Sequence, residues 1–324
     1  MKRVFIIAML VLAIAMPIFA TGAKEEKNSS SYPSRPITFI VNRAAGGATD
    51  AVARVVATAI QKDLGYTTVV QNLEGGDGLI GANTAITSKP DGYTFMIVGS
   101  SEIPNMLVNF PEVAFSREDL IPICGLTSKS KLLAVKPNSS IKTMDDFIAY
   151  AKANPGKVTI AVSGSNHIYG VILLEKALGV DLTIVNAGGG SAAFTMLLGG
   201  HVECGLIDSN YYANCETEGI TILADTTDNV SVVPEGYSTF TELGYDMVDT
   251  NFNYILAPKG TPNEIVRFIS DSVAKLVDEY DLESALEATG QNAVFVPNSE
   301  FTDEYFNYLD KMIKLYDQVN KLDV

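Results

Sequence analysis

The sequence predicts an α/β fold built from two α/β units, and three features of the chain support this prediction. Short runs rich in β-branched and aromatic residues, typical of strands, alternate with longer runs of helical spacing. Glycine-rich turns separate the two kinds of run. The alternation is found before residue 102 and again after residue 157. Because strands joined through a helix pair in parallel, each unit should contain parallel strands with helices on the faces of its sheet.

The first unit should begin with a strand at 37–41, a turn of small residues, and a helix near Asp50. The apolar residues that follow Asp50 lie three or four positions apart, so one face of this helix should be buried. A strand, a helix and a strand should then complete this alternation, at 67–72, 79–88 and 93–98. Two short strands, at 121–126 and 131–136, should follow it before the second alternation begins.

The second unit should open with a helix that runs to Asn154. Thr143 and Asp146 have the spacing of a capping box at its start, and Pro155 stops it. Strand and helix then alternate, and two strands close the unit: 158–162, 168–178, 182–185, a helix ending at 198, 202–207 and 220–224.

The last part of the chain supplies a strand at 254–258 and two helices. Thr261 and Glu264 predict another capping box, with Pro262 at the first helical position. The final helix, at about 299–321, has aromatic and aliphatic residues along one face. Such a stripe is expected to pack in the core rather than to hold a cofactor.

Residues 1–20 have the pattern of a signal peptide, with Lys2 and Arg3 before an apolar run at 4–15. We expect this segment to be cleaved, a flexible leader at 21–34 to follow, and the mature protein to be periplasmic. The alternative is an anchor that stays uncleaved.

Net charge and cysteine content exclude several functions. The formal charge of −15 argues against nucleic acid or an anionic membrane as a partner. An anion site would have to be built locally, from backbone dipoles and a few cations. The three cysteines show no zinc spacing, and we expect no metal site or cofactor. We expect buried free thiols, with a Cys204–Cys215 disulfide as the alternative.

The turn Ala45-Gly46-Gly47-Ala48-Thr49-Asp50 is the first candidate binding element. It joins a strand to a helix start and carries small side chains, so a ligand can approach the backbone closely. The unpaired N–H groups of a helix start and the helix dipole attract anions, which suggests a carboxylate site that includes the Thr49 hydroxyl. Asp50 would repel such a ligand, so we expect it to cap N–H groups within its own loop.

A second loop of the same design, Gly188-Gly189-Gly190-Ser191-Ala192, lies in the second unit. If the two units face each other, both helix starts could bind one anion, with Ser191 contributing its hydroxyl. The alternative is that the glycines of each loop only allow a tight turn.

Other candidates lie where strands end. Ser100 and Ser101 follow one strand, Ser163 and His167 follow another, and Asp208 follows a third. Nucleophile elbows, phosphate loops and metalloprotease motifs are absent from the sequence, so no residue is assigned a catalytic role. The motif GxGxxG at 76–81 does not lie on the first strand, and we interpret it as a loop at the rim of a binding site.

Several motifs, taken in order, resemble one family of receptors. These are Tyr32-Pro33-Ser34-Arg35-Pro36-Ile37 with the first glycine turn, Gly75 to Gly81, Pro90 to Thr94, Thr143 to Phe147, Leu197 to Val202, and Ala257 to Pro262. The set covers nearly all of 32–324 and is similar to the Bug-type extracytoplasmic solute receptors of tripartite tricarboxylate transporters.

The resemblance implies a two-domain periplasmic binding protein, type II-like, with a mixed sheet in each domain and a hinge of crossing strands. The domains would be 32–128 with 225–324, and 129–224. The ligand would be a small organic carboxylate held by the two glycine loops, including Ala45, Gly46, Gly47 and Asp50. The receptor, acting as a monomer, would deliver it to the membrane components of a transporter.

Two departures from the family pattern concern the ligand. Asn42-Arg43 replaces a proline and an aromatic residue, and Asn186-Ala187 replaces Pro-Tyr. Arg43 could pair with a second acidic group of the ligand or point to solvent. Two other functions stay open: a sensor subunit for a membrane kinase, and a periplasmic hydrolase or lyase that uses His167 with Asp208.

Overall fold

The computed structural model describes residues 32–110 and 115–320 of the chain. Every helix and strand of these residues lies in the compact unit Arg35–Val324. The expected signal peptide and nearly all of the expected leader lie outside the described residues.

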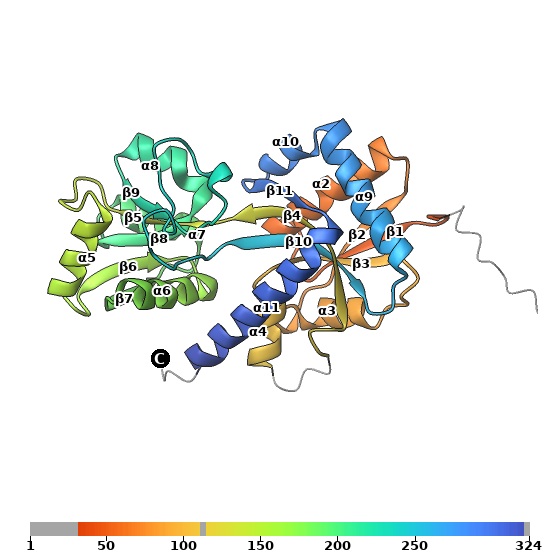
Figure 1. The fold of residues 1–324 in the computed structure, drawn as a ribbon, viewed down its shortest axis with the longest axis horizontal. Helices are drawn as coiled ribbons and strands as arrows, with labels where there is room; N and C mark the ends of the chain where they lie inside the picture. The colour runs from red at the N-terminus through yellow and green to blue at the C-terminus, as the bar shows by residue number, and fades with distance from the viewer. Residues whose placement is uncertain (1–31, 111–114, 321–324) are drawn as a thin grey trace, which may run out of the picture. The chain divides into compact units, whose positions relative to one another are not determined.

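The first sheet has six strands in the order β11-β4-β10-β3-β1-β2 (Figure 1). As predicted, β1 pairs in parallel with both β2 and β3. The other pairs, β3–β10, β10–β4 and β4–β11, are antiparallel, so the sheet is mixed. Its strands are β1 (Ile37–Val41), β2 (Thr68–Asn72), β3 (Thr94–Gly99), β4 (Leu120–Lys129), β10 (Asn251–Pro258) and β11 (Asn292–Val296).

Helices cover both faces of this sheet. On one face, α2 (Ala48–Asp63), α9 (Asn263–Tyr280) and α10 (Leu282–Glu287) bury a core that includes Phe39 and Phe95. On the other face, α3 (Leu79–Ile86), α4 (Glu102–Asn109) and α11 (Asn298–Asn320) pack around Met96 and Tyr254. A short 3-10 turn, η2 (Gly76–Gly78), precedes α3.

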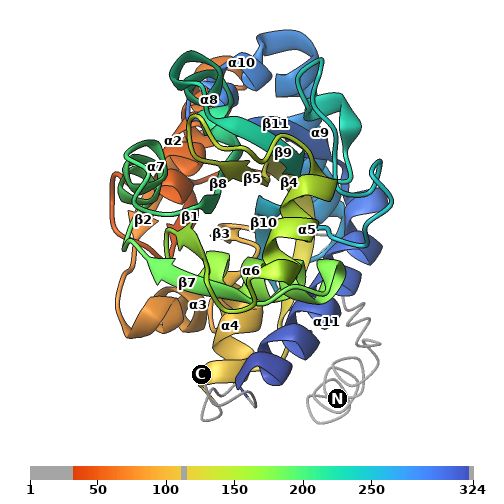
Figure 2. The same ribbon diagram turned by 90° about the vertical axis from the view of Figure 1, so that its left-hand side faces the viewer.

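The second sheet has five strands in the order β7-β6-β8-β5-β9, and it repeats the pattern of the first (Figure 2). In this sheet β6 pairs in parallel with β7 and β8, and β5 is antiparallel to β8 and β9. The strands are β5 (Lys131–Val135), β6 (Val158–Val162), β7 (Leu182–Asn186), β8 (Cys204–Asp208) and β9 (Thr221–Asp225).

Helices again cover both faces. The helices α5 (Met144–Ala153) and α6 (Ser165–Leu178) lie on one face, and α7 (Gly190–Leu198) and α8 (Tyr212–Glu218) lie on the other. Two 3-10 turns, η3 (Ser209–Tyr211) and η4 (Val230–Val232), complete the secondary structure. The predicted α/β class, with mixed sheets flanked by helices, is therefore confirmed.

Most predicted elements are confirmed, and the differences have local causes. Thr143 and Asp146 form the expected capping box at the start of α5. The capping box predicted at Thr261 is wrong, because this hydroxyl donates to the carbonyl of Pro258, and Pro262 lies at the N-cap of α9. The elements α4, α8, α10 and β11 were not predicted, since each has only five to eight residues, too few to show a clear period.

The chain passes between the two sheets where β4 leads into β5 and where the segment after β9 leads into β10 (Figure 1). The strands β4 and β10 pair over their whole length, from Leu120–Pro258 to Lys129–Asn251. Phe240 and Met247, which lie between β9 and β10, pack in the core of the second sheet. We therefore propose two domains within 35–324, with the later boundary near residue 250 rather than at 224.

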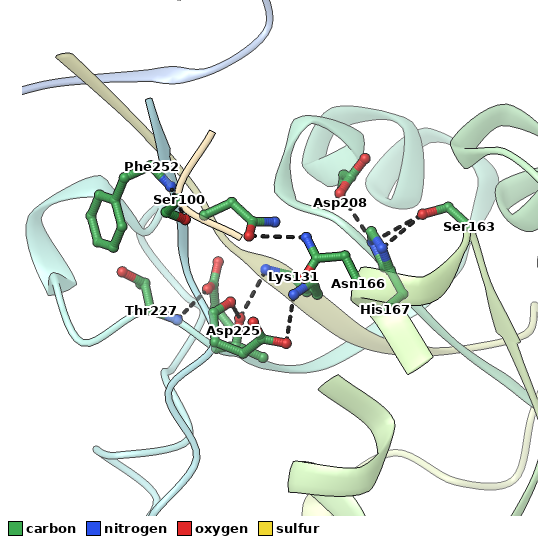
Figure 3. Close-up of polar contacts among 12 residues, drawn as sticks. Ser100, Lys131, Ser163, Asn166, His167, Asp208, Asp225, Thr227 and Phe252 are labelled. Carbon is green, nitrogen blue, oxygen red and sulfur yellow. Dashed lines mark hydrogen bonds and ion pairs between the residues drawn. The ribbon is translucent and has the colours of Figure 1, made fainter. Parts of the chain in front are cut away.

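A buried ion pair lies at this crossing. The ammonium of Lys131, which is fully buried, lies 2.5 Å from Oδ2 of Asp249. The N–H of Lys131 donates to the Thr226 hydroxyl, and that hydroxyl donates to the carbonyl of Asp249. Residues of both connections between the sheets are thus tied together at one point (Figure 3).

Replacing Lys131 by methionine should destabilise the protein by about 3–5 kcal/mol, because Asp249 would be left buried without its counter-charge. Adding Asp249→Leu should restore much of that loss, since the pair would then be apolar. Urea denaturation followed by circular dichroism measures both effects.

The matched control is Lys275→Met, which removes an exposed lysine 3.7 Å from Glu279 and should change stability by less than about 0.5 kcal/mol. Equal stability of Lys131→Met and wild type would contradict the role given to the buried pair.

Candidate functional site

The first glycine loop presents the start of α2. Residues 44–48 are exposed, and Gly47 is the N-cap of α2 without any side chain capping it. Gly46 has a φ of +85°, a conformation that favours glycine. The first N–H that bonds back along the helix is that of Ala51, to the carbonyl of Gly47. The N–H groups before it are those that a helix start offers to an anion.

Asp50 holds this loop in shape, as the sequence predicted. Its carboxylate accepts hydrogen bonds from Gly46 N–H at 2.8 Å, Arg54 at 2.9 Å and Asn72 at 2.9 Å. Burial alone would raise the pKa of Asp50, but these bonds outweigh it and lower the pKa. The side chain is buried and fully engaged, so the direct ligand contact implied by the family resemblance does not fit this geometry.

Arg43 pairs with two carboxylates of its own chain, although 40% of its side chain is exposed. Its Nε donates to Oε2 of Glu102 at 2.9 Å, and its Nη1 donates to Oδ1 of Asp77 at 2.8 Å. Burial would lower the pKa of Arg43, but the two carboxylates raise it. Two of the guanidinium N–H donors are therefore used within the chain, and a contact between the remaining donors and an acidic group of the ligand stays a prediction.

Glu102 lies beside the first loop. A Cβ placed on Gly99 would lie 3.6 Å from Oε1 of Glu102 and 3.9 Å from the hydroxyl of Thr49. Both groups therefore border the backbone where β3 ends. Glu102 was not among the residues predicted from the sequence, where the two serines before it were chosen, although an acid at the carboxyl end of a parallel strand was a usable signal.

The two serines have different environments. Ser100 is fully buried; its hydroxyl donates to the Tyr308 hydroxyl at 3.0 Å and accepts from Phe252 N–H at 3.0 Å. A ligand contact by Ser100 is therefore wrong for this conformation, since its hydroxyl ties β10 to α11. Ser101 is half-buried, is the N-cap of α4, and borders a cavity with Glu102.

The second glycine loop presents the start of α7. Gly189 is its N-cap, again without a side-chain cap, and nothing lies within 4 Å of a Cβ placed there. Gly188 donates its N–H to the Asn186 side chain at 3.0 Å. Ser191 and Ala192 are exposed, and the Tyr211 hydroxyl lies 3.5 Å from the Ser191 hydroxyl. A Cβ on Gly190 would lie 3.5 Å from Oδ2 of Asp208, so this carboxylate borders the same helix start.

Ser163, His167 and Asp208 form one network (Figure 3). The Ser163 hydroxyl lies 2.7 Å from Nδ1 of His167, and Nε2 of His167 lies 3.1 Å from Oδ1 of Asp208. The other oxygen of Asp208 lies 3.0 Å from the ammonium of Lys129, a residue that sequence analysis missed. These contacts are satisfied when Nε2 of His167 carries the proton and donates it to Asp208, while the Ser163 hydroxyl donates to Nδ1.

Burial has opposite effects on the pKa values of the two titrating groups of this network. Burial lowers the pKa of His167, against the opposing effect of Asp208, so the imidazole is neutral at neutral pH. For Asp208, burial would raise the pKa, but the His167 bond and the Lys129 charge lower it well below its usual range. His167 is 6% exposed, and the Ser163 hydroxyl, which precedes the start of α6 at Ser165, contacts its Nδ1. The network positions Asp208 beside α7 rather than preparing a nucleophile.

The start of α6 rests on the crossing strands. Asn166 donates from Nδ2 to Oδ1 of Asn251 at 2.9 Å (Figure 3). Gly170 packs directly on the Asp249 carboxylate, which a Cβ at that position would strike. Since Asn166 and His167 are consecutive, α6 links the crossing strands to Asp208 and the second loop.

The predicted site residues therefore fall into two groups. Thr49 borders Glu102 next to α2, whereas Ser163, His167 and Asp208 lie beside α7. Asn166 of α6 and Glu102 of α4 line one cavity, and Arg43 and Ser101 are the predicted site residues that line it with them. That the two glycine loops enclose a single ligand stays a prediction.

The GxGxxG motif at 76–81 allows α3 to pack closely against the end of β1, which explains its glycines without a bound dinucleotide. A Cβ on Gly81 would lie 2.8 Å from Cα of Asn42 and 2.8 Å from the carbonyl of Leu73, so α3 can approach β1 only with glycine there. Asp77, in the same motif, pairs with Arg43. The interpretation as a loop beside the binding site, rather than a dinucleotide site, fits these contacts.

Cys124, Cys204 and Cys215 are free and buried, as expected. Burial raises the pKa of Cys215 to about 12, so the thiol is not reactive at neutral pH. Within 32–110 and 115–320, no three histidine, cysteine or acidic side chains group as metal ligands would. In the same residues, no helix has the length and apolar character needed to cross a membrane.

Comparison with known proteins gives a consistent result. The model of the family described as "Tripartite tricarboxylate transporter family receptor" matches residues 52–317. The UPF0065 protein in the gbd 5' region of Cupriavidus necator is 31% identical over 93% of this chain and 92% of its own length. Protein BugT of Bordetella pertussis is 29% identical over 88% of this chain and 89% of its own length.

Solved structures agree. A TctC solute binding protein from Polaromonas superposes with a TM-score of 0.79 and 28% identity, over 89% of this chain and 99% of that protein. An R. palustris protein with adipate (TM-score 0.68, 24% identity, 88% and 98% coverage) shares the fold. MatC from Rhodopseudomonas palustris with bound malate shares it too, with a TM-score of 0.65 and 23% identity over 88% of this chain and 100% of that protein.

The buried His167 predicts a stability change in mild acid. Its folded-state pKa lies below the usual 6.5, so on acidification the unfolded chain takes up the proton first and stability falls below about pH 6.5. The variant His167→Gln should lose less stability than wild type between about pH 7.5 and 5.5. Urea denaturation at the two pH values measures the difference.

The exposed His201 provides the control: His201→Gln should keep the pH dependence of wild type. If His167→Gln and wild type lose the same stability on acidification, the histidine is not held neutral by its surroundings.

Proposed function

Because this chain belongs to the tripartite tricarboxylate transporter family of receptors, we propose that it captures a small organic carboxylate and delivers it to the membrane proteins of such a transporter. The family and the fold are those of solute-binding receptors, and the chain is a receptor rather than an enzyme. The hydrolase or lyase considered from the sequence is thereby set aside.

One observation carries the proposal: two helices, α2 and α7, begin at exposed glycine loops that no side chain caps. Each start offers N–H groups and the positive end of a helix dipole to an anion. The cations beside these loops are already paired, Arg43 with Glu102, Arg54 with Asp50 and Lys129 with Asp208. The backbone is therefore the main source of attraction for a carboxylate.

Known relatives support the ligand class. The two Rhodopseudomonas proteins of the same fold were solved with adipate and with malate, both of which are carboxylates. In this chain the corresponding contacts would come from Gly46, Gly47 and Thr49 on one side and from 188–192 on the other. Ser163, His167 and Asp208 would position the second side.

Capture would involve closure about the crossing strands. A ligand that contacts both helix starts stabilises only the conformation in which they approach each other, so binding shifts the population toward it. We propose that the receptor acts in the periplasm, as a monomer, after removal of 1–20, and that the closed form is what the membrane components recognise.

Replacing Gly47 or Gly189 by leucine should abolish ligand binding without unfolding the protein. A Cβ on Gly47 meets only the Ala44 carbonyl at 3.4 Å, and one on Gly189 meets nothing within 4 Å, so both positions tolerate a side chain. The added bulk would cover the N–H groups. Calorimetry with the carboxylate found by a thermal-shift screen should show a dissociation constant near micromolar for wild type and at least about a hundredfold weaker binding for each variant.

The control is Ala285→Leu, which adds the same side chain to an exposed helix position near the far end of α2. It should bind like wild type. Unchanged affinity of both glycine variants would refute the proposed grip by the two loops.

A further inference from the structure

A cavity of about 230 Å³ lies between the starts of α4 and α6, and nothing above gives it an occupant. Arg43, Ser101 and Glu102 line it from the side of the first sheet. Asn166 and Tyr169 line it from α6, and Tyr316 lines it from α11. It therefore joins parts of the chain that belong to both sheets.

Glu102 leaves one acceptor unused in this cavity. Its Oε2 accepts from Asn42 at 2.6 Å and from Arg43 at 2.9 Å, whereas Oε1 has no donor among the described residues. The side chain is only 11% exposed. Burial raises the pKa of Glu102, against the opposing effects of Arg43 and Asn42.

Asn166 supplies a second unused acceptor. Its Nδ2 donates to Asn251, and its Oδ1 is buried without a hydrogen-bond partner in the part of the chain that the structure describes. Buried acceptors are normally paired, so the Asn166 oxygen indicates a missing donor, and Oε1 of Glu102 is a second acceptor without a donor on a residue that lines the same cavity. A carboxylate group has no proton to donate, whereas an ammonium group has three.

A place for the ligand's carboxylate lies alongside. Arg43 uses Nε and Nη1 on Glu102 and Asp77, and a guanidinium has five N–H donors in all. Oε1 of Glu102 and the hydroxyl of Thr49, at the start of α2, both lie within 4 Å of the position a Cβ on Gly99 would take. Oε1 of Glu102 and the Thr49 hydroxyl therefore border the same stretch of backbone, where β3 ends beside the start of α2.

We propose that the ligand carries an ammonium group next to its carboxylate, and that Glu102 and Asn166 select it. This inference rests on the proposed function and names the ligand class as amino acids. Glu102 is then a specificity-determining residue that touches the ligand. A second ionised carboxylate in this cavity would face Glu102 and Asp77 and would be repelled.

The test compares three acids on one four-carbon skeleton, succinate, malate and aspartate, with the purified receptor in calorimetry. A three-carbon set, propionate, lactate and alanine, repeats the comparison. In the set that binds, the amino acid should bind at least about tenfold more tightly than the unsubstituted acid, with the hydroxy acid between them.

Two variants test whether Glu102 is the residue that causes the preference for the amino acid. Glu102→Gln should reduce the preference for the amino acid to near unity while the unsubstituted acid binds no more weakly than before. Asp91→Asn is the matched control, because Asp91 also pairs with an arginine, Arg35 at 2.8 Å, but does not line the cavity. It should keep the preference.

The outcomes separate this inference from the proposed function. Binding of carboxylates with no amino-acid preference, or equal affinity for hydroxy and amino acids, overturns the inference and leaves the receptor function standing. A preference that survives in Glu102→Gln overturns the role of Glu102. Failure of all six compounds to bind wild type at millimolar concentration overturns both. The wild-type series decides the ligand class even if Glu102→Gln does not fold.

Discussion

The buried ion pair between Lys131 and Asp249 fixes the point at which the chain passes between its two sheets. A charge in that position is stable only with its partner, so the two connections must meet there. The residues two positions away carry the candidate site: Lys129 contacts Asp208, and Asn251 contacts Asn166. Gly170 allows α6 to lie directly on Asp249. The geometry of the crossing therefore sets where α6 begins, and with it the side chains that face the first sheet.

Each candidate loop depends on a carboxylate that is held in place. Asp50 shapes the α2 start by accepting the Gly46 N–H, and Asp208 borders the α7 start while paired with His167 and Lys129. These two carboxylates pair with the nearest cations, Arg54 and Lys129, so the positive charge of those side chains is already neutralised. In a chain with a net charge of −15, selection of an anion then depends on aligned peptide groups, which act only at short range.

The tertiary structure also corrects how individual residues were interpreted. Ser100 and Ser101 looked equivalent in sequence, yet the first is a buried link to Tyr308 and the second borders a cavity. Glu102, immediately after them, has the free oxygen that a ligand could use. Arg43 was expected to reach a ligand acid or solvent, and its pairing with Glu102 and Asp77 could not be foreseen because those partners are 59 and 34 residues away in sequence.

Local patterns in the sequence were enough to determine the strand–helix alternation, the capping box at Thr143, the role of Asp50 within its loop, and the family. These features depend on neighbours within a few residues, where spacing and side-chain chemistry decide the outcome. The pairing of Arg43, the network around Asp208, and the meeting of Glu102 and Asn166 at one cavity depend on contacts between distant segments. Those contacts are fixed by the register of the sheets and by the buried charge at their crossing, and no local pattern encodes them.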